Sequence, residues 1–467
     1  MSEVATHHVA LGALAFLAAV IVLRLAVRHE TDRMIGRIIV VGFIAKLLGT
    51  FVYFRVLNDV YGTGDVRRYV QNGATIAADI RSGSMPDQAT ETGTQFMNFI
   101  VGVVFSVTGP NEIVGYLVFA VLSFVGMYLF LQAFKLSLPQ ADHRRYAVLV
   151  LLLPTMVFWP STIGKEPWLV FTLGVAAYGA ARALRKRRLS YLFIALGTAG
   201  VFAVRPHMAA LFVIALAVAF FVRFRDPDVR IGLASGLVGI AIVGSGVSYV
   251  LINYADEVSG TEASDEAPGS AVDRFMESTD ELLERTQTQT TRGGSEFDSR
   301  PVRNPIDFAH ALVTVPFRPF PNEAHNVLAQ LASLEGVLLL GLVIASVPRM
   351  ARFGSEFFRR PYLMLASTYA VGFIIAFSNV ANFGILTRQR AQLFPFLLVL
   401  LCLPIGRMAS DEGSEEELAG EPTGQLRSGP LLVVSAERTR TVSEGGQSTE
   451  LVFDLPPGCI RPPGGAG

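Results

Sequence analysis

The sequence predicts an all-α membrane protein, a polytopic transmembrane bundle of about eleven helices. Hydrophobic residues make up 51% of the 467 residues, and the mean hydropathy is +0.45. Charged residues make up only 17%, whereas soluble domains carry about 25%. Apolar runs long enough to cross a bilayer follow one another along the chain. Because backbone groups in lipid must find partners within their own segment, each run is expected to be a helix.

The predicted spans occupy a transmembrane domain at residues 1–406. Most connectors between the spans are short, but two are long and cover about residues 58–111 and 254–328. Residues 407–467 form a separate polar tail. The candidate spans are 8–27, 34–57, 112–134, 146–160, 167–184, 190–204, 208–222, 231–253, 329–348, 362–379 and 391–406.

The distribution of basic residues predicts the orientation of the spans. Lys and Arg concentrate in loops on the cytoplasmic side of a membrane. Placing the basic connectors there puts the N-terminus and both long loops outside and the tail in the cytoplasm. A further apolar run at 96–109 would invert every later loop if it crossed the bilayer, so we expect a re-entrant or interfacial helix there. The basic connectors are residues 28–37, 135–145, 182–188, 223–230 and 349–360.

The tail begins acidic at residues 411–421 and ends rich in Pro and Gly, so it is expected to be largely disordered. The two cysteines, Cys402 and Cys459, lie in an apolar run and in the tail, and we expect neither a disulfide between them nor a metal site. The net charge is zero and indicates no class of partner. No nucleic-acid partner is expected.

The first candidate site motif is the glycine-rich stretch 62–69, which follows the second span. Glycines permit a tight turn that can present Asp65 at the membrane surface. A carboxylate there can act as a general base on a sugar hydroxyl, with Arg67 beside it as a substrate-binding cation. The alternative is an ordinary turn in which Asp65 pairs with Arg67 or Arg68.

The second motif, residues 160–168, is an abrupt turn between two spans. Lys165 can receive a phosphate, and Glu166 can orient it or act as an acid or base. Alternatively, Lys165 and Glu166 pair with each other and cap the next helix. The third motif, Arg205-Pro206-His207, lies between two apolar runs with almost no loop, and its His207 is either a substrate-binding residue or a structural histidine. Arg205 must therefore sit at the membrane surface, where it needs an anionic partner: a lipid phosphate, Asp65 or Glu166.

Two further motifs lie in predicted outer segments. Residues 316–326 combine prolines, aromatics and Arg318, which can bind substrate, pair with Glu323 or sit in an interfacial anchor. Residues 379–390 are predicted to be an outer loop that carries Arg388 and Arg390. Arginines outside run against the usual charge bias, so these two are candidates to bind a (pyro)phosphate or stabilise a phosphate leaving group. Pairing with outer-loop carboxylates is the alternative.

Taken together, these motifs place several cations and one or two carboxylates on one membrane face. This combination fits a lipid-(pyro)phosphate substrate. The motifs occur in the order Gly-Asp-x-x-x-Tyr, Gly-Thr-Gln-Phe, Pro-Ser-x-x-Gly-Lys-Glu, Arg-Pro-His, Phe-Arg-Pro-Phe-Pro-x-Glu and Asn-Phe-Gly-x-x-x-Arg-Gln-Arg. Over residues 34–406 this order resembles bacterial O-antigen and exopolysaccharide polymerases and class C glycosyltransferases.

The resemblance implies a class C glycosyltransferase-like bundle in the bacterial cell membrane that transfers a sugar or oligosaccharide from a polyprenyl-(pyro)phosphate. It maps the base to Asp65 and the phosphate-binding arginines to Arg205, Arg388 and Arg390. Glu166 departs from the Gly-Lys-Asp pattern expected at its position. Many class C enzymes require a divalent metal, but no second carboxylate accompanies Asp65, so we expect no metal cofactor. The expected partners are the polyprenyl-linked saccharide, membrane lipid and envelope-assembly proteins.

Two rival hypotheses stay open. A transporter or flippase of lipid-linked sugars would also need basic groups facing a groove, but it predicts ionisable residues at mid-membrane, where the sequence has few, and an inverted repeat. A non-catalytic scaffold for envelope assembly predicts that the outer charges pair only with each other. The glycosyltransferase hypothesis predicts instead that the charges from distant motifs face one cavity.

Overall fold

The computed structural model describes residues 2–56, 65–223, 297, 300–351 and 353–405. Within these residues the chain is helical and contains no strand. The predicted span at 231–253 and the tail lie outside the described residues. The chain divides into two compact units, and all the described residues belong to the first, Met1–Met408.

Helices occupy every predicted span within the described residues. Five of the helices are long and apolar enough to cross a membrane, as expected of a membrane protein: Leu11–Arg28, Arg33–Val56, Glu112–Ser137, Lys165–Leu184 and Val327–Ala345. The remaining predicted spans are shorter or broken helices, so the count of eleven stays a prediction. The helices are α1 Ser2–Arg28, α2 Arg33–Val56, α3 Asp65–Arg81, α4 Thr94–Thr108, α5 Glu112–Ser137, α6 His143–Leu152, α7 Pro154–Phe158, α8 Lys165–Leu184, α9 Ser190–Val204, α10 Pro206–Arg223, α13 Pro305–Phe317, α14 Val327–Ala345, α15 Val347–Met350, α16 Phe353–Phe357, α17 Pro361–Phe377 and α18 Phe383–Leu401.

Helix α8 lies between α5 and α9 and is the most buried of the five long helices. Glycines allow these close approaches. A Cβ atom on Gly126 of α5 would clash with the carbonyl oxygen of Val170, and one on Gly197 of α9 would clash with the backbone nitrogen of Ala176. The tight packing fixes the height of α8 in the bundle, and with it the position of its first residues, Lys165 and Glu166.

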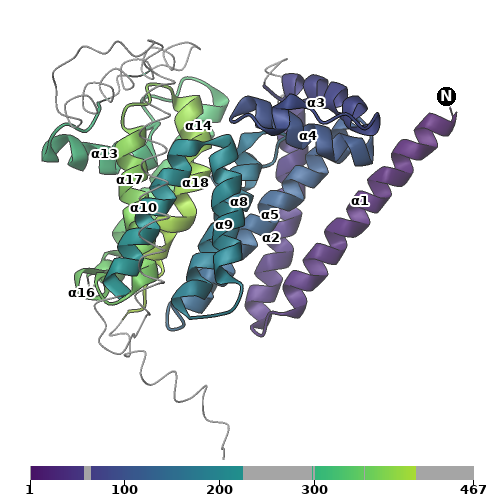
Figure 1. The fold of residues 1–467 in the computed structure, drawn as a ribbon. Helices are drawn as coiled ribbons and strands as arrows, with labels where there is room; N and C mark the ends of the chain where they lie inside the picture. Colours follow the sequence, from purple (N-terminus) through teal and green to yellow (C-terminus); the bar gives the residue numbers. More distant parts are fainter. Residues whose placement is uncertain (1, 57–64, 224–296, 298–299, 352, 406–467) are drawn as a thin grey trace, which may run out of the picture. The chain divides into compact units, whose positions relative to one another are not determined.

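Helices α3 and α4 pack against each other and lie across one end of the bundle (Figure 1). Helix α4 is the segment predicted to be re-entrant or interfacial. The two helices meet closely, because a Cβ atom on either Gly73 or Gly102 would clash with a side chain of the other helix. The buried side of α3 carries Val66 and Tyr69, which pack in a small core with Met97. This packing holds the N-terminal end of α3 against the ends of α2 and α8.

The predicted span 146–160 is two helices rather than one. Helix α6 ends at Leu152, and Leu153 takes an extended conformation before Pro154 begins α7. Proline disfavours helical geometry in the residue before it and has no N–H to donate. The break therefore lies where the sequence places Pro154. The next proline, Pro160, follows the end of α7 and opens the turn that leads into α8.

The predicted outer loop at 379–390 is wrong in one respect, because α18 already begins at Phe383. Asn382 takes the N-cap position, and its side-chain oxygen accepts a hydrogen bond of 3.1 Å from the Ile385 N–H. Asn is among the residues that best satisfy a free N–H at a helix start. Arg388 and Arg390 are consequently helical residues, and their directions are set by the helix.

Candidate functional site

A cavity of about 380 Å³ lies at the end of the bundle where α3 and α4 cross it, called here the cavity end. Its volume falls within the range of roughly 300–1,000 Å³ that is typical of small-molecule sites. Its walls come from α2, α3, the start of α4, the turn before α8, the start of α8, the junction of α9 with α10, and α18. The lining residues are Tyr53, Val66, Arg68, Tyr69, Thr94, Thr162, Ile163, Gly164, Lys165, Glu166, Arg205 and Arg388.

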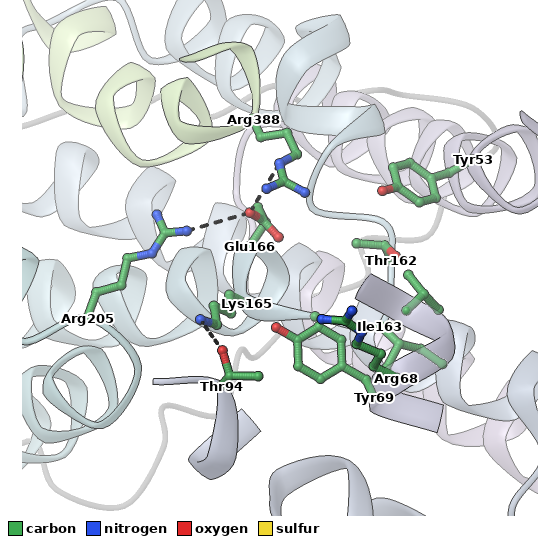
Figure 2. Close-up of a pocket in the computed structure, with 12 residues that line it drawn as sticks. Tyr53, Arg68, Tyr69, Thr94, Thr162, Ile163, Lys165, Glu166, Arg205 and Arg388 are labelled. Atoms are coloured by element: carbon green, nitrogen blue, oxygen red, sulfur yellow. Dashed lines mark hydrogen bonds and ion pairs between the residues drawn. The ribbon is translucent and has the colours of Figure 1, made fainter. Parts of the chain in front are cut away.

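Glu166 lies at the centre of the charged part of this cavity (Figure 2). Its carboxylate oxygen Oε1 is 3.7 Å from Nη2 of Arg205 and 3.7 Å from Nε of Arg388. Lys165 donates a hydrogen bond of 2.9 Å from Nζ to the hydroxyl of Thr94. Three cations from α8, the α9–α10 junction and α18 therefore converge around one buried carboxylate.

The local sequence explains how these side chains reach the cavity. Gly164 precedes α8 in an extended conformation, and no side chain caps the first turn of the helix. The positive end of the helix dipole lies at this turn and adds positive potential at the cavity. Arg205 is the single residue between α9 and α10, since Pro206 starts the next helix. It therefore stays at the junction of the two helices, as the missing loop predicted.

The described lining residues carry a clear excess of positive charge, because Arg68, Lys165, Arg205 and Arg388 face the single carboxylate of Glu166. Nη1 of Arg205 is buried and has no hydrogen-bond partner in the described part of the chain. Buried polar groups normally have such a partner. The cavity can therefore supply further hydrogen bonds to an anionic, oxygen-rich ligand.

The opposite wall of the cavity has a different character. Figure 2 shows Tyr53, Thr162 and Ile163 on the side away from Arg205. Tyrosine combines an apolar ring with a polar hydroxyl, so such a wall can hold a group that is partly apolar and partly hydroxylated. The cavity thus offers a cationic region and an aromatic, hydroxyl-bearing region next to each other.

Of the residues predicted for the site, Lys165, Glu166, Arg205 and Arg388 line the cavity together. Asp65 begins α3 directly before the lining residue Val66, and its side chain lies outside the described residues. Arg67 is exposed and does not line the cavity, whereas its neighbour Arg68 does. Consecutive residues of a helix point about 100° apart, so the two neighbouring arginines face different directions.

The other predicted residues lie away from the cavity. His207 is exposed in the first turn of α10 and is not a lining residue. Arg318 pairs with Glu323 at 2.8 Å, which was the alternative stated for that motif, and its guanidinium lies 4.7 Å from the ring centre of Phe297. These contacts hold Arg318 in the segment between α13 and α14.

Arg390 is buried on another side of α18 from Arg388. Its Nε donates a hydrogen bond of 2.9 Å to the carbonyl oxygen of Val315 in α13. Residues two positions apart on a helix do not face the same way. We expected both arginines to reach one ligand because we predicted an extended loop there. Since α18 already begins at Phe383, the two side chains point to different sides of a helix.

Several lining residues were not among the predicted site residues. Tyr69 and Thr94 belong to motifs that carried the family resemblance, but the sequence analysis assigned neither of them a role. Thr162 lies in the turn between two prolines that was already a candidate. Tyr53 lies in the apolar run of α2, and nothing in the sequence separates it from the aromatic residues around it.

The described residues hold no group of three or more His, Cys, Asp or Glu side chains placed to bind a metal ion. The chemistry that the described side chains can provide is anion binding by Lys and Arg, with Glu166 fixing two guanidinium groups. Arg forks match phosphate oxygens in geometry as well as charge. The chain matches no protein-family model, no curated protein and no solved structure.

Proposed function

We propose that this chain is a membrane glycosyltransferase or glycan polymerase that uses a sugar or oligosaccharide linked to polyprenyl (pyro)phosphate. The observation that carries the proposal is the convergence of Lys165, Arg205 and Arg388 on one cavity at the end of an apolar helix bundle. A lipid-linked substrate has its phosphate at the membrane surface and its sugar just beyond it. A cationic cavity at the end of the bundle matches that arrangement.

In the proposed reaction an acceptor hydroxyl attacks C1 of the donor sugar, and the bond between C1 and the phosphate oxygen breaks. The electron pair of that bond leaves with the polyprenyl (pyro)phosphate. Arg205, Arg388 and Lys165 stabilise the negative charge that grows on this leaving group. Removal of one such group from an active site typically costs about 10²–10³ in turnover.

The proton of the acceptor hydroxyl has to go to a base, and we assign that role to Asp65. Its backbone begins α3 beside the lining residue Val66. Glu166 has a different role, because its ion-pair partners are Arg205 and Arg388. It is a positioning residue that holds the two guanidinium groups in place for the phosphate.

The test is an analysis of the glycolipids in a strain from which the gene has been deleted. Accumulation of complete lipid-linked repeat units indicates a polymerase, and accumulation of a precursor that lacks one sugar indicates a single-sugar transferase. Unchanged glycolipids and unchanged envelope polysaccharide contradict the proposal. Repeat units that accumulate only in the inner leaflet would instead support the flippase hypothesis.

A matched pair of variants connects the phenotype to the cavity. Arg67 and Arg68 are both exposed, but Arg68→Ala removes a lining cation of α3 and Arg67→Ala removes its neighbour, which does not line the cavity. Returned to the deletion strain, Arg67→Ala is expected to restore glycan synthesis, while Arg68→Ala restores it only in part. Equal restoration by the two variants, at equal protein levels in the membrane, would count against the cavity as the site.

A further inference from the structure

Two buried ionisable side chains take no part in the cavity. Lys46 of α2 and Glu335 of α14 are 1% and 7% exposed, and both lie in helices that are long and apolar enough to span a membrane. An ionised group in such a position is costly and commonly serves a function. Both contact the same short helix, α7, which stands between the break at Leu153 and the turn that leads to the cavity.

Glu335 holds the first turn of α7. Its Oε1 accepts a hydrogen bond of 2.9 Å from the backbone N–H of Thr155, and its Oε2 accepts one of 2.7 Å from the Thr155 hydroxyl. The break before Pro154 leaves the first N–H groups of α7 without partners in the preceding helix. A carboxylate is well suited to this position, because it also complements the positive end of the helix.

Lys46 contacts the middle of α7. Its ammonium donates a hydrogen bond of 3.0 Å to the carbonyl oxygen of Met156. In a continuous helix that carbonyl would accept from the N–H four residues later, but the residue there is Pro160, which has none. Lys46 supplies the donor that Pro160 lacks, and Glu335 accepts from an N–H that the break before Pro154 leaves without a partner in the preceding helix.

Helix α7 is connected to the cavity both through the chain and through side chains. The residues that follow it are Trp159 and the turn containing Thr162, Ile163 and Gly164, which line the cavity before α8 begins. The rings of Phe158 and the lining residue Tyr53 lie 5.0 Å apart between centres. A shift of α7 would therefore move the cavity wall and the first residues of α8.

We propose that Lys46 and Glu335 are positioning residues that clamp α7 and thereby set the placement of the turn 159–164, and of Lys165 and Glu166, for an anionic substrate. The inference depends on the proposed function, because it assigns these residues to the site where the lipid phosphate would bind. The clamp acts at a distance from the ligand, since neither residue lines the cavity.

The test measures the affinity of the full-length protein in lipid nanodiscs for inorganic pyrophosphate by titration calorimetry, alongside the thermal midpoint of each variant. Lys46→Met and Glu335→Gln are expected to weaken binding about tenfold, as is common for residues that act on a site without touching the ligand. The matched control is Glu356→Gln. Glu356 of α16 is buried to a similar degree and pairs at 3.6 Å with Arg360, which precedes α17; α16 lies at the other end of the bundle (Figure 1).

A second pair of variants keeps the test decisive if the charge variants do not fold. Thr155→Ser retains the hydroxyl that donates to Glu335, and Thr155→Val removes it at nearly the same volume. We expect Thr155→Ser to bind pyrophosphate as the unmodified protein does, and Thr155→Val to bind more weakly. Equal affinity of these two variants overturns the clamp, as does a charge variant that folds and binds normally.

The outcomes separate this inference from the proposed function. Failure of the unmodified protein to bind pyrophosphate would overturn the proposed phosphate site and the clamp with it. Normal binding by the unmodified protein and by all the α7 variants would overturn the clamp alone. A residue that only stabilised the fold would lower the thermal midpoint and leave the affinity of the folded fraction unchanged, which also contradicts the clamp.

Discussion

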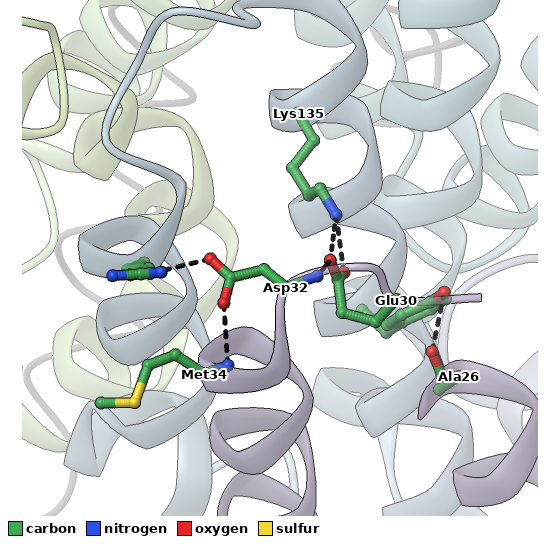
Figure 3. A network of polar contacts seen from close by, with 7 residues as sticks. Ala26, Glu30, Asp32, Met34 and Lys135 are labelled. Carbon is green, nitrogen blue, oxygen red and sulfur yellow. Dashed lines mark hydrogen bonds and ion pairs between the residues drawn. The ribbon is translucent and has the colours of Figure 1, made fainter. Parts of the chain in front are cut away.

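At the end of the bundle away from the cavity, three cations each lie against a carboxylate of their own. Figure 3 shows the centre of this network, where Lys135 reaches Glu30 and the backbone N–H of Asp32 also donates to Glu30. The pairs connect the α1–α2 turn, α5, α6 and α15. The distances are 2.6 Å for Lys135–Glu30, 2.8 Å for Arg144–Asp32 and 3.1 Å for Arg349–Asp142.

At the cavity end, by contrast, Arg205 and Arg388 share the carboxylate of Glu166, and both distances are 3.7 Å. Charge-assisted hydrogen bonds are normally about 2.7–2.9 Å long, so these two contacts are looser than those of the other end. Cations also outnumber the carboxylate among the described lining residues. The comparison teaches that the three pairs at one end each join two segments of the bundle through short contacts, while at the cavity end two cations share one carboxylate through longer ones.

The largest expected effect comes from removing a cavity cation. Arg205→Ala should reduce glycan synthesis at least about 100-fold, because it removes a group that stabilises the leaving phosphate. The free energy of unfolding should change little, since the ion pair with Glu166 is long and one guanidinium nitrogen has no partner in the described structure. Glycan synthesis by the variant in the deletion strain and its thermal midpoint in detergent measure the two quantities.

A normal rate of glycan synthesis in Arg205→Ala would show that this cavity cation has no role in the reaction. A large loss of stability with normal synthesis by the folded fraction would show that Arg205 joins helices in the same way as the cations at the other end. Lys135→Met serves as the reference in both assays, since it removes a cation whose carboxylate partner lies at 2.6 Å and away from the cavity.

Lys135→Met itself should show the reverse result. The side chain of Glu30 is 1% exposed, so removal of Lys135 leaves a buried carboxylate without its cation. Loss of one partner of a buried pair costs roughly 3–5 kcal/mol. We expect a value near the lower end of this range, because the Asp32 N–H still donates to Glu30 and Lys135 itself is partly exposed. The free energy of unfolding, measured for Lys135→Met and for the unmodified protein, should show this loss. Glycan synthesis per folded molecule should be unchanged.

The sequence predicted which chain segments would meet, because helices of known length must start and end at the membrane faces. Arg205 shows this most clearly. With one residue between two helices, its position at the end of the bundle follows from the apolar runs and Pro206 alone. The turn at 160–168 is a similar case, since two prolines and a glycine confine Lys165 and Glu166 to the start of α8.

The sequence did not predict which way each helix is rotated. Arg67 was chosen over Arg68, and Arg390 was grouped with Arg388, because both stretches were interpreted as loops without a fixed direction. A helix turns neighbouring residues about 100° apart, so the exact helix start decides which side chain faces the cavity. Asn382 as a potential N-cap was the one signal that could have placed the start of α18 correctly.

Buried charges inside the spans were also missed. The expectation of few ionisable residues in mid-membrane overlooked Lys46 and Glu335, each of which stands alone in an apolar run. Their partners are backbone and hydroxyl groups of α7, which follow from the break at Pro154 and the missing N–H of Pro160. A single sequence gives no sign that three distant helices meet at those two prolines, so the pairing requires the fold.

The smallest effect in this comparison is expected from Asp32, whose ion pair with Arg144 is the most exposed of the three. Hydrogen bonds from Arg144 and from the Met34 N–H hold the pKa of the Asp32 carboxyl below its ordinary value of 3.8. Since the pKa is lower in the folded state than in the unfolded state, the ionised carboxylate stabilises the fold above that ordinary value. This stabilisation is lost as the pH falls through the lowered pKa.

The thermal midpoint of Asp32→Asn should therefore lie slightly below that of the unmodified protein at pH 7, and the difference should shrink toward pH 2. It should also shrink in about 1 M salt, where exposed charges are screened. A difference that stays constant across pH and salt would show that the helix-start hydrogen bond to Met34, rather than the charge, is the contribution of Asp32.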